Sequence, residues 1–183
     1  EREARKAREE AALAAVNWER DREERERREA EARRLLWEET AAAVEECKED
    51  VALQKLQSLR NAADVVPRPI GPGGATLLHR AVSRALAGVI DAIFAIDPAA
   101  ATYVDEEGQT ALHRAASVDS TGELVTLIAE RAGPAELDRR DARDRTPLDL
   151  AREWALPEVV AALLEARRQA EVAASMEEAA AAA

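Results

Sequence analysis

Residues 76–82 read Thr-Leu-Leu-His-Arg-Ala-Val, residues 110–116 read Thr-Ala-Leu-His-Arg-Ala-Ala, and residues 146–152 read Thr-Pro-Leu-Asp-Leu-Ala-Arg. The threonines at positions 76, 110 and 146 are therefore 34 and 36 residues apart. A second, apolar pattern keeps this phase, because pairs of aliphatic residues recur at steps of 34, 34 and 36. The pairs are Leu56 and Leu59, Ile90 and Ile93, Leu124 and Leu127, and Val160 and Leu163. Two markers with one period predict an internal repeat.

The repeated segment resembles the ankyrin repeat, whose signature Thr-Pro-Leu-His-x-Ala is nearly met in the first two copies and becomes Thr-Pro-Leu-Asp-Leu-Ala in the third. The resemblance covers about residues 70–166 and implies an all-α solenoid. Its three repeats are expected at about residues 70–104, 105–140 and 141–166, with the helical part over 76–166.

The resemblance also implies a role for the two histidines, His79 and His113, since the family uses an imidazole at this position to bond neighbouring turns. In the third copy Asp144 stands where Gly74 and Gly108 stand in the others. Asp tolerates a left-handed backbone better than most residues, so we expect the turn to survive.

Two other departures change the connections between the repeats. Gly71 replaces the usual turn Asp of the first repeat, and extra residues near Gly133 and Pro134 lengthen the connection between the second and third.

Upstream of the repeats, residues 51–66 are similar to the end of another repeat but lack the Thr-Pro-Leu-His part. We expect them to form a capping half-repeat that covers the first repeat. Residues 67–75 are rich in Pro and Gly and are expected to form a linker. No Gly-Lys-Ser/Thr follows, so a phosphate-binding loop is disfavoured.

Residues 1–60 contain neither Pro nor Gly and are rich in strong helix formers, which predicts one continuous helix with a long charged part over 1–50. Acids precede bases by four residues in several places, a spacing that stabilises a single helix. The pairs are Asp21 and Arg25, Glu23 and Arg27, Glu24 and Arg28, and Glu29 and Arg33. A heptad seam begun at Ala4 fails at Asp21, so a solvated rod, a partial coiled coil and a partner-binding helix remain alternatives.

The aromatic residues of this helix are candidates for docking on a neighbour, because an exposed Trp is unusual. Trp18 and Trp37 lie in apolar patches at the two ends of the charged stretch. Packing within the protein's own fold is the other interpretation, and it is favoured for Trp37, which lies nearer the repeats.

Bulk composition excludes several classes of function. The net charge of −11 disfavours nucleic acid as the main ligand. A single cysteine, Cys47, cannot form an intramolecular disulfide, which favours a reducing compartment. The sequence has neither a bilayer-spanning run nor an apolar signal-peptide core, so we expect no membrane partner. Because it lacks an initiator methionine, we expect a piece of a longer polypeptide, and residues 167–183 predict an Ala-rich helical tail.

Catalytic and metal-binding patterns are not found in the sequence. Only two histidines are present, Cys47 lies far from both, and no serine has a nucleophile-elbow context. We therefore expect no enzyme activity, no cofactor, no metal and no small-molecule substrate.

The resemblance implies protein binding through the hairpin tips and the exposed side of the inner helices. The candidate contacts are Tyr103, Asp105, Glu106, Glu107, Arg139, Arg140, Arg143, Arg145, Arg80, Arg84, Arg114, Trp18 and Trp37. The alternative is that charged tips only keep the domain soluble. Trp154 ends the last inner helix, and we expect it to be a buried cap residue rather than an interface anchor.

These observations predict a scaffold that binds a protein through its repeats and docks its N-terminal helix along a large cytoskeletal assembly. A ciliary or flagellar axoneme is the assembly we expect, with a cytoplasmic or cytoskeletal location. One alternative is a soluble regulatory adaptor that recruits a signalling enzyme, with the helix as spacer. Another is an enzyme whose catalytic domain lies outside this sequence.

Overall fold

The structure, a computed structural model, describes residues 2–59, 69–70 and 73–181. Over these residues the chain is helical and contains no β-strand, which confirms the all-α class. Residues 60–66 of the expected half-repeat and residues 67, 68, 71 and 72 of the expected linker, Gly71 among them, lie outside the described residues. The helices are α1 (Arg2–Glu45), α2 (Glu49–Ser58), α3 (Leu77–Ser83), α4 (Ala87–Ile96), η2 (Pro98–Thr102), α5 (Ala111–Val118), α6 (Glu123–Ala132), α7 (Pro134–Leu137), α8 (Pro147–Glu153) and α9 (Pro157–Ala181).

The inner helices α3, α5 and α8 all begin in the same way. Thr76, Thr110 and Thr146 are their N-cap residues, and each forms a capping box with the third residue of its helix. This arrangement satisfies amide groups that an uncapped helix leaves without a partner. The repeated threonines therefore mark the starts of the inner helices.

The turns between helices are also repeated. Cys47, Ala85 and Ala155 have a left-handed backbone with φ of 55°, 55° and 54°. In each case the next residue donates its amide to the carbonyl of an alanine near the end of the preceding helix, at 2.9–3.0 Å, with Ala43, Ala81 and Ala151 as acceptors. The shared turn sets α1 against α2, α3 against α4, and α8 against α9.

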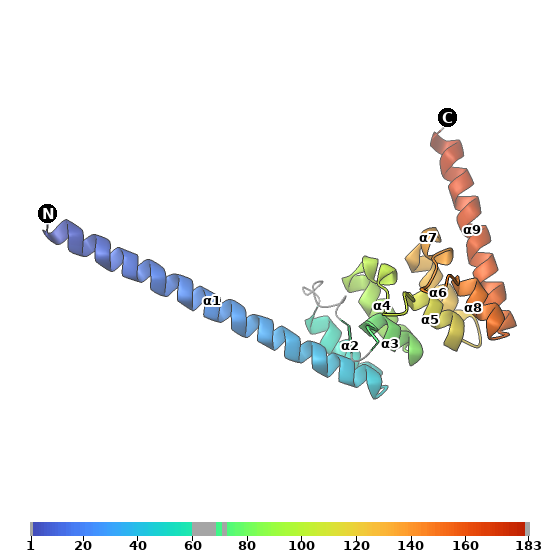
Figure 1. The fold of residues 1–183 in the computed structure, drawn as a ribbon, viewed down its shortest axis with the longest axis horizontal. Coiled ribbons are helices and arrows are strands. Elements are labelled where there is room, and N and C mark those ends of the chain that lie inside the picture. Colours follow the sequence, from blue (N-terminus) through green and yellow to red (C-terminus); the bar gives the residue numbers. More distant parts are fainter. Residues whose placement is uncertain (1, 60–68, 71–72, 182–183) are drawn as a thin grey trace.

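Four helical hairpins follow one another along the body of the molecule (Figure 1): the end of α1 with α2, α3 with α4, α5 with α6, and α8 with α9. The core between them is built from small and aliphatic side chains, and Ala81, Ala115 and Ala151 are fully buried in it. Alanines at these positions let neighbouring helices approach closely. The extra residues after Gly133 form the single turn α7, whose Leu137 is buried.

The predicted continuous helix over residues 1–60 is wrong, because the chain reverses at residues 46–48. The last turns of α1 pack against α2 and α3, and they bury Trp37, Val44 and Leu56 in the core. The residues before the first repeat therefore form a complete hairpin instead of half of one. No Gly or Pro marks the reversal, which depends on burial of apolar residues on both sides of it.

The rest of α1 projects away from the body as a single helix (Figure 1). At a rise of about 1.5 Å per residue, the projecting part is about 50 Å long. Glu24 pairs with Arg28 and Glu29 with Arg33, as predicted, whereas the other two predicted pairs are not within 4.0 Å. Such exposed pairs each add a few tenths of a kcal/mol, about the scale that supports an isolated helix.

At the other end, α9 continues past the body to Ala181, which confirms the predicted helical tail up to that residue. None of the helices described is both long enough and apolar enough to cross a bilayer.

The two N-terminal tryptophans provide a direct test of this fold. Trp37 is 4% exposed and Trp18 is 57% exposed. Trp37→Ala should therefore lower the free energy of unfolding by about 3–5 kcal/mol, because it leaves a large cavity. Trp18→Ala, the matched control, should change it by less than about 0.5 kcal/mol. Urea denaturation followed by circular dichroism measures both, and equal effects would contradict the buried position of Trp37.

Candidate functional site

Three turns lie side by side along one edge of the stack, the first with Ile70 and residues 73–75 as its described residues, the others at residues 105–109 and 141–145. Each is closed by a backbone hydrogen bond between its ends, for example from the Asp105 amide to the Gln109 carbonyl at 3.0 Å. Successive turns are also joined. The Glu106 amide donates to the Gly73 carbonyl at 3.0 Å, and the Ala142 amide donates to the Glu107 carbonyl at 2.9 Å. The three turns therefore form one continuous hydrogen-bonded edge.

Gly74 and Gly108 are required by this close approach. Both have positive φ, 68° and 72°, and a Cβ on either would lie 3.0 Å from the backbone nitrogen of the next turn. Asp144 has the same left-handed backbone, with φ of 63°, as predicted. Its side chain is tolerated because its own carboxylate is exposed and no described turn follows it.

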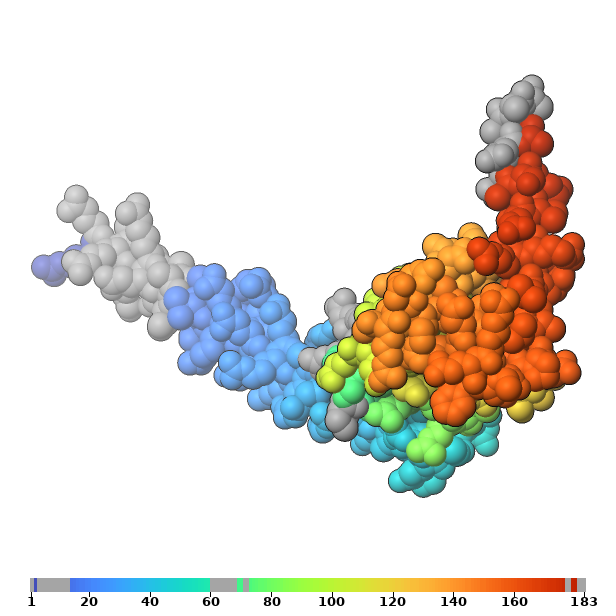
Figure 2. Space-filling view, turned by 45° about the vertical axis from the view of Figure 1, so that its right-hand side comes forward, coloured from blue at the N-terminus to red at the C-terminus, as the bar shows by residue number. Residues whose placement is uncertain are grey.

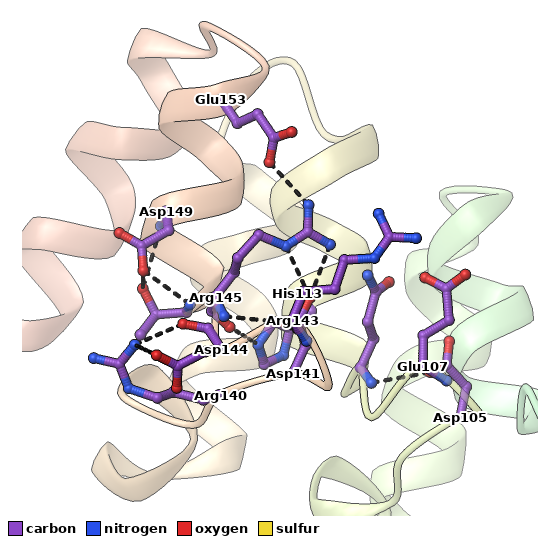
Figure 3. A network of polar contacts seen from close by, with 12 residues as sticks. Asp105, Glu107, His113, Arg140, Asp141, Arg143, Asp144, Arg145, Asp149 and Glu153 are labelled. Atoms are coloured by element: carbon purple, nitrogen blue, oxygen red, sulfur yellow. Dashed lines mark hydrogen bonds and ion pairs between the residues drawn. The ribbon is translucent and has the colours of Figure 1, made fainter.

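Buried aspartates hold the second and third turns rigid (Figure 3). Asp105 Oδ1 accepts the amides of Glu107 and Gln109, both at 2.9 Å. Asp141 Oδ1 accepts the amides of Arg143 and Arg145, and the Arg145 guanidinium donates to Oδ2 at 2.9 Å. Burial alone would raise the pKa of Asp141, but these hydrogen bonds outweigh it and lower the pKa to about 2.

The two histidines link one hairpin to the next. His79 Nδ1 accepts from the Thr76 amide at 3.2 Å, and Nε2 lies 2.9 Å from the Gln109 carbonyl. His113 repeats the arrangement, with Nε2 3.1 Å from the Arg145 carbonyl. An amide can only donate and a carbonyl can only accept, so each imidazole is neutral with its proton on Nε2. The predicted bond between neighbouring turns is confirmed.

The charges on the turns fall into paired and unpaired groups. Arg139 pairs with Glu136, Arg140 with Asp144, and Arg145 with Asp141 and Glu153. Three exposed side chains make no ion pair with any described residue: Glu106, Glu107 and Arg143. Asp105 is turned inward to its own turn, where it also lies 3.9 Å from Arg114. Its oxygens are engaged within the fold and nearly buried, which disfavours Asp105 among the predicted partner contacts.

The arginines of the inner helices are largely engaged within the fold. Glu45, at the end of α1, lies 3.3 Å from Arg80 and accepts from Arg84 at 2.7 Å. Arg80 also donates to the Ile70 carbonyl at 3.2 Å. These two arginines therefore join the second hairpin to the first. The sequence showed them as exposed cations, because nothing in it places Glu45 opposite them.

The aromatic candidates are divided between the surface and the interior. Tyr103 is half-buried and its hydroxyl donates to Asp97 at 2.7 Å, which raises the pKa of Tyr103. Trp18 is exposed with the Arg22 guanidinium 5.3 Å from its ring centroid, whereas Trp37 lies in the core. Trp154 is 62% exposed, so the expectation that it is a buried cap residue is wrong. It ends α8 at the position that Arg84 has in α3, and both side chains reach solvent.

No group of His, Cys, Asp and Glu among the described residues is arranged to hold a metal ion. In the comparisons with known proteins, no family model and no curated protein matches the chain.

The histidines predict a specific dependence of stability on pH. Burial lowers the pKa of both imidazoles below 6.5, so the unfolded chain binds more protons than the folded chain as pH falls below that value. The free energy of unfolding should be constant above about pH 7 and fall between about pH 6.5 and 5.

Chemical denaturation at a series of pH values measures this decrease. The double variant His79→Asn, His113→Asn should be less stable at pH 7. Its free energy of unfolding should not decrease between about pH 6.5 and 5. Asp141 does not contribute there, since its stabilisation is lost only as pH falls below about 4 toward 2. An unchanged decrease in the double variant would contradict the assignment.

The buried aspartates predict a second pattern. Asp141→Ala and Asp105→Ala each leave two buried or partly buried amides without their side-chain acceptor and should lower the free energy of unfolding by about 1–3 kcal/mol. Glu106→Ala and Arg143→Ala, on the same turns, should change it by less than about 0.5 kcal/mol. Thermal and urea denaturation compare the stabilities of the four variants. Equal losses for the two variants on one turn, whether the residue is buried or exposed, would contradict the prediction.

Proposed function

We propose that the chain is an ankyrin-repeat scaffold that binds a protein along the edge formed by its turns and has no enzyme activity of its own. The repeated threonine caps and histidine links support the family. Between hairpins, His79 and His113 connect turns in the way that the resemblance to ankyrin repeats implies.

One observation carries the binding proposal: Glu106, Glu107 and Arg143 are exposed charges on turns that are otherwise immobilised. Asp105 and Asp141 fix the backbone beneath them, and backbone bonds join the two turns. A preorganised surface loses little conformational entropy when it binds, so the same contacts give higher affinity. Acidic and basic groups on adjacent turns suit a partner with the opposite pattern of charge.

The projecting part of α1 supports a role in a large assembly. It carries an exposed Trp18 and Val16. The helix extends away from the body (Figure 1), so it reaches neighbours that the body cannot. We propose that it docks along a cytoskeletal assembly in the cytoplasm, and the axoneme of a cilium or flagellum is the assembly in which to test it first.

A soluble regulatory adaptor that recruits a signalling enzyme is the second candidate. The observation that favours it is the charged middle of α1, whose side chains over residues 19–34 are all exposed. A helix that is polar all round serves well as a spacer.

Site-specific photocrosslinking in the native complex tests the proposal. A photoreactive residue at Glu107 or at Arg143 should link to one and the same protein. The same residue at Glu130, which is exposed on the outer helix α6, is the control and should not link to it. Links to different proteins, or equal links from Glu130, would contradict binding at the turns.

A photoreactive residue at Trp18 separates the two candidates. The scaffold predicts reproducible links from this position in a fraction that resists extraction with high salt. The regulatory adaptor predicts no links from Trp18 and a turn-bound partner that salt removes.

A further inference from the structure

We propose that the last hairpin carries a second binding site, which takes an amphipathic helix from a partner protein. The site is the groove between α8 and the first turns of α9, lined by Arg152, Leu156, Val160, Ala161 and Leu164. We call it the end groove. It shares no residue with the turn edge of the proposed function and stands independently of it.

Four of the five positions that define the end groove are buried in an earlier hairpin; the exception is Ala161, which corresponds to the exposed Asp91. The shared turn geometry aligns Leu156 with Leu86, so Val160 corresponds to Ile90 and Leu164 to Phe94. Ile90 and Phe94 are 0% and 5% exposed, whereas Leu164 is 45% exposed. The α3–α4 hairpin and the α8–α9 hairpin each pack against the hairpin before them. Leu164 is therefore exposed because no described element lies on the other side of the α8–α9 hairpin. Figure 2 shows α8 and the start of α9 at the front of the body, with nothing over them.

The opposite end of the stack is different in character. The outer side of the first hairpin carries Glu38, Glu39 and Lys55, and Lys55 pairs with Glu39. A polar outer face is what a terminal hairpin of a helical stack needs for solubility. The first hairpin also exposes Leu35 and Val51, at 48% and 39%, whereas the lining of the end groove is apolar except for Arg152.

The geometry of the turn edge, the edge formed by the three hydrogen-bonded turns, restricts which structure can cover the end groove. A further hairpin of the same kind would place its turn against Asp144, as Ala142 approaches Gly108. Asp144 carries a side chain at that place, held by the 3.3 Å ion pair with Arg140. A helix that lies only against α8 and α9 avoids this obstruction.

Charge decides between a second copy and another protein. Arg152 lies in the end groove at the position of Val82 and Ala116, both fully buried. It forms no ion pair within 4.0 Å with any described residue, although its charge helps to lower the pKa of Asp149. Two copies packed groove to groove would bury both Arg152 side chains in a contact whose lining residues include no acid, which is unfavourable. A helix with an aliphatic stripe and one acidic residue opposite Arg152 complements both features.

Two labelled peptides of about 18 residues, long enough to form helices, are the probes. Both carry leucines at steps of three and four, and one has a Glu on the edge of the stripe where the other has a Lys. Fluorescence anisotropy with the full chain should show saturable binding of the Glu peptide and weaker binding of the Lys peptide. Amide chemical shifts should change around Leu156, Val160 and Leu164.

Matched variants localise the binding. Leu164→Arg should weaken the Glu peptide at least about tenfold, whereas Val172→Arg, on an equally exposed part of α9 outside the groove, should leave it unchanged. Arg152→Glu should reverse the preference between the peptides, and Arg143→Glu, on the turn edge, should not. All four positions are exposed, and circular dichroism should show unchanged melting.

Three results would overturn the proposal. They are no saturable binding of either peptide, binding that Leu164→Arg does not weaken, and a dimer in sedimentation that Leu164→Arg dissociates, which would assign the groove to a second copy. Peptide binding that survives Glu107→Arg separates this site from the turn edge, so either proposal can fail alone.

Discussion

The structure depends on a buried, neutral imidazole that belongs to two hairpins at once. In His79 and His113, Nδ1 closes the start of its own helix and Nε2 reaches the carbonyl of the next turn. A buried imidazole N–H left without an acceptor costs more than the bond contributes, so the two histidines favour the one register in which each Nε2 meets the carbonyl of the next turn. The turn edge, with its exposed charges, lies where this register places it.

The last repeat departs from the others at two positions for one reason. Asp149 replaces the histidine and Asp144 replaces the glycine. No described turn follows this repeat, so an imidazole would have no carbonyl to reach and a Cβ at position 144 meets no backbone. Asp149 still accepts from the amide and hydroxyl of Thr146, so the helix start is kept while the link onward is lost. The same end exposes Leu164, whose counterpart Phe94 is buried inside the stack.

Local features of the sequence predicted the all-α class and some details of the repeated segment. The left-handed backbone of Asp144 and the histidine bonds between turns involve groups at fixed spacings in that segment, so the repeat pattern was sufficient to predict them. The reversal at Cys47 was not predictable in this way, because it has no Gly or Pro and depends on Trp37 and Val44 packing against α2 and α3. The inward position of Asp105 and the pairing of Glu45 with two arginines were missed for a similar reason: both depend on neighbours in space.

The central claim is that the end of α1 with α2 is the first hairpin of one cooperative stack, while the rest of α1 is a solitary rod. Native-state hydrogen exchange tests this most directly. The account predicts that amides of residues 41–56 are protected to nearly the same free energy as those of α3, α5 and α8, while amides of residues 14–34 exchange rapidly. Exchange of residues 41–56 as fast as that of the rod would contradict the account.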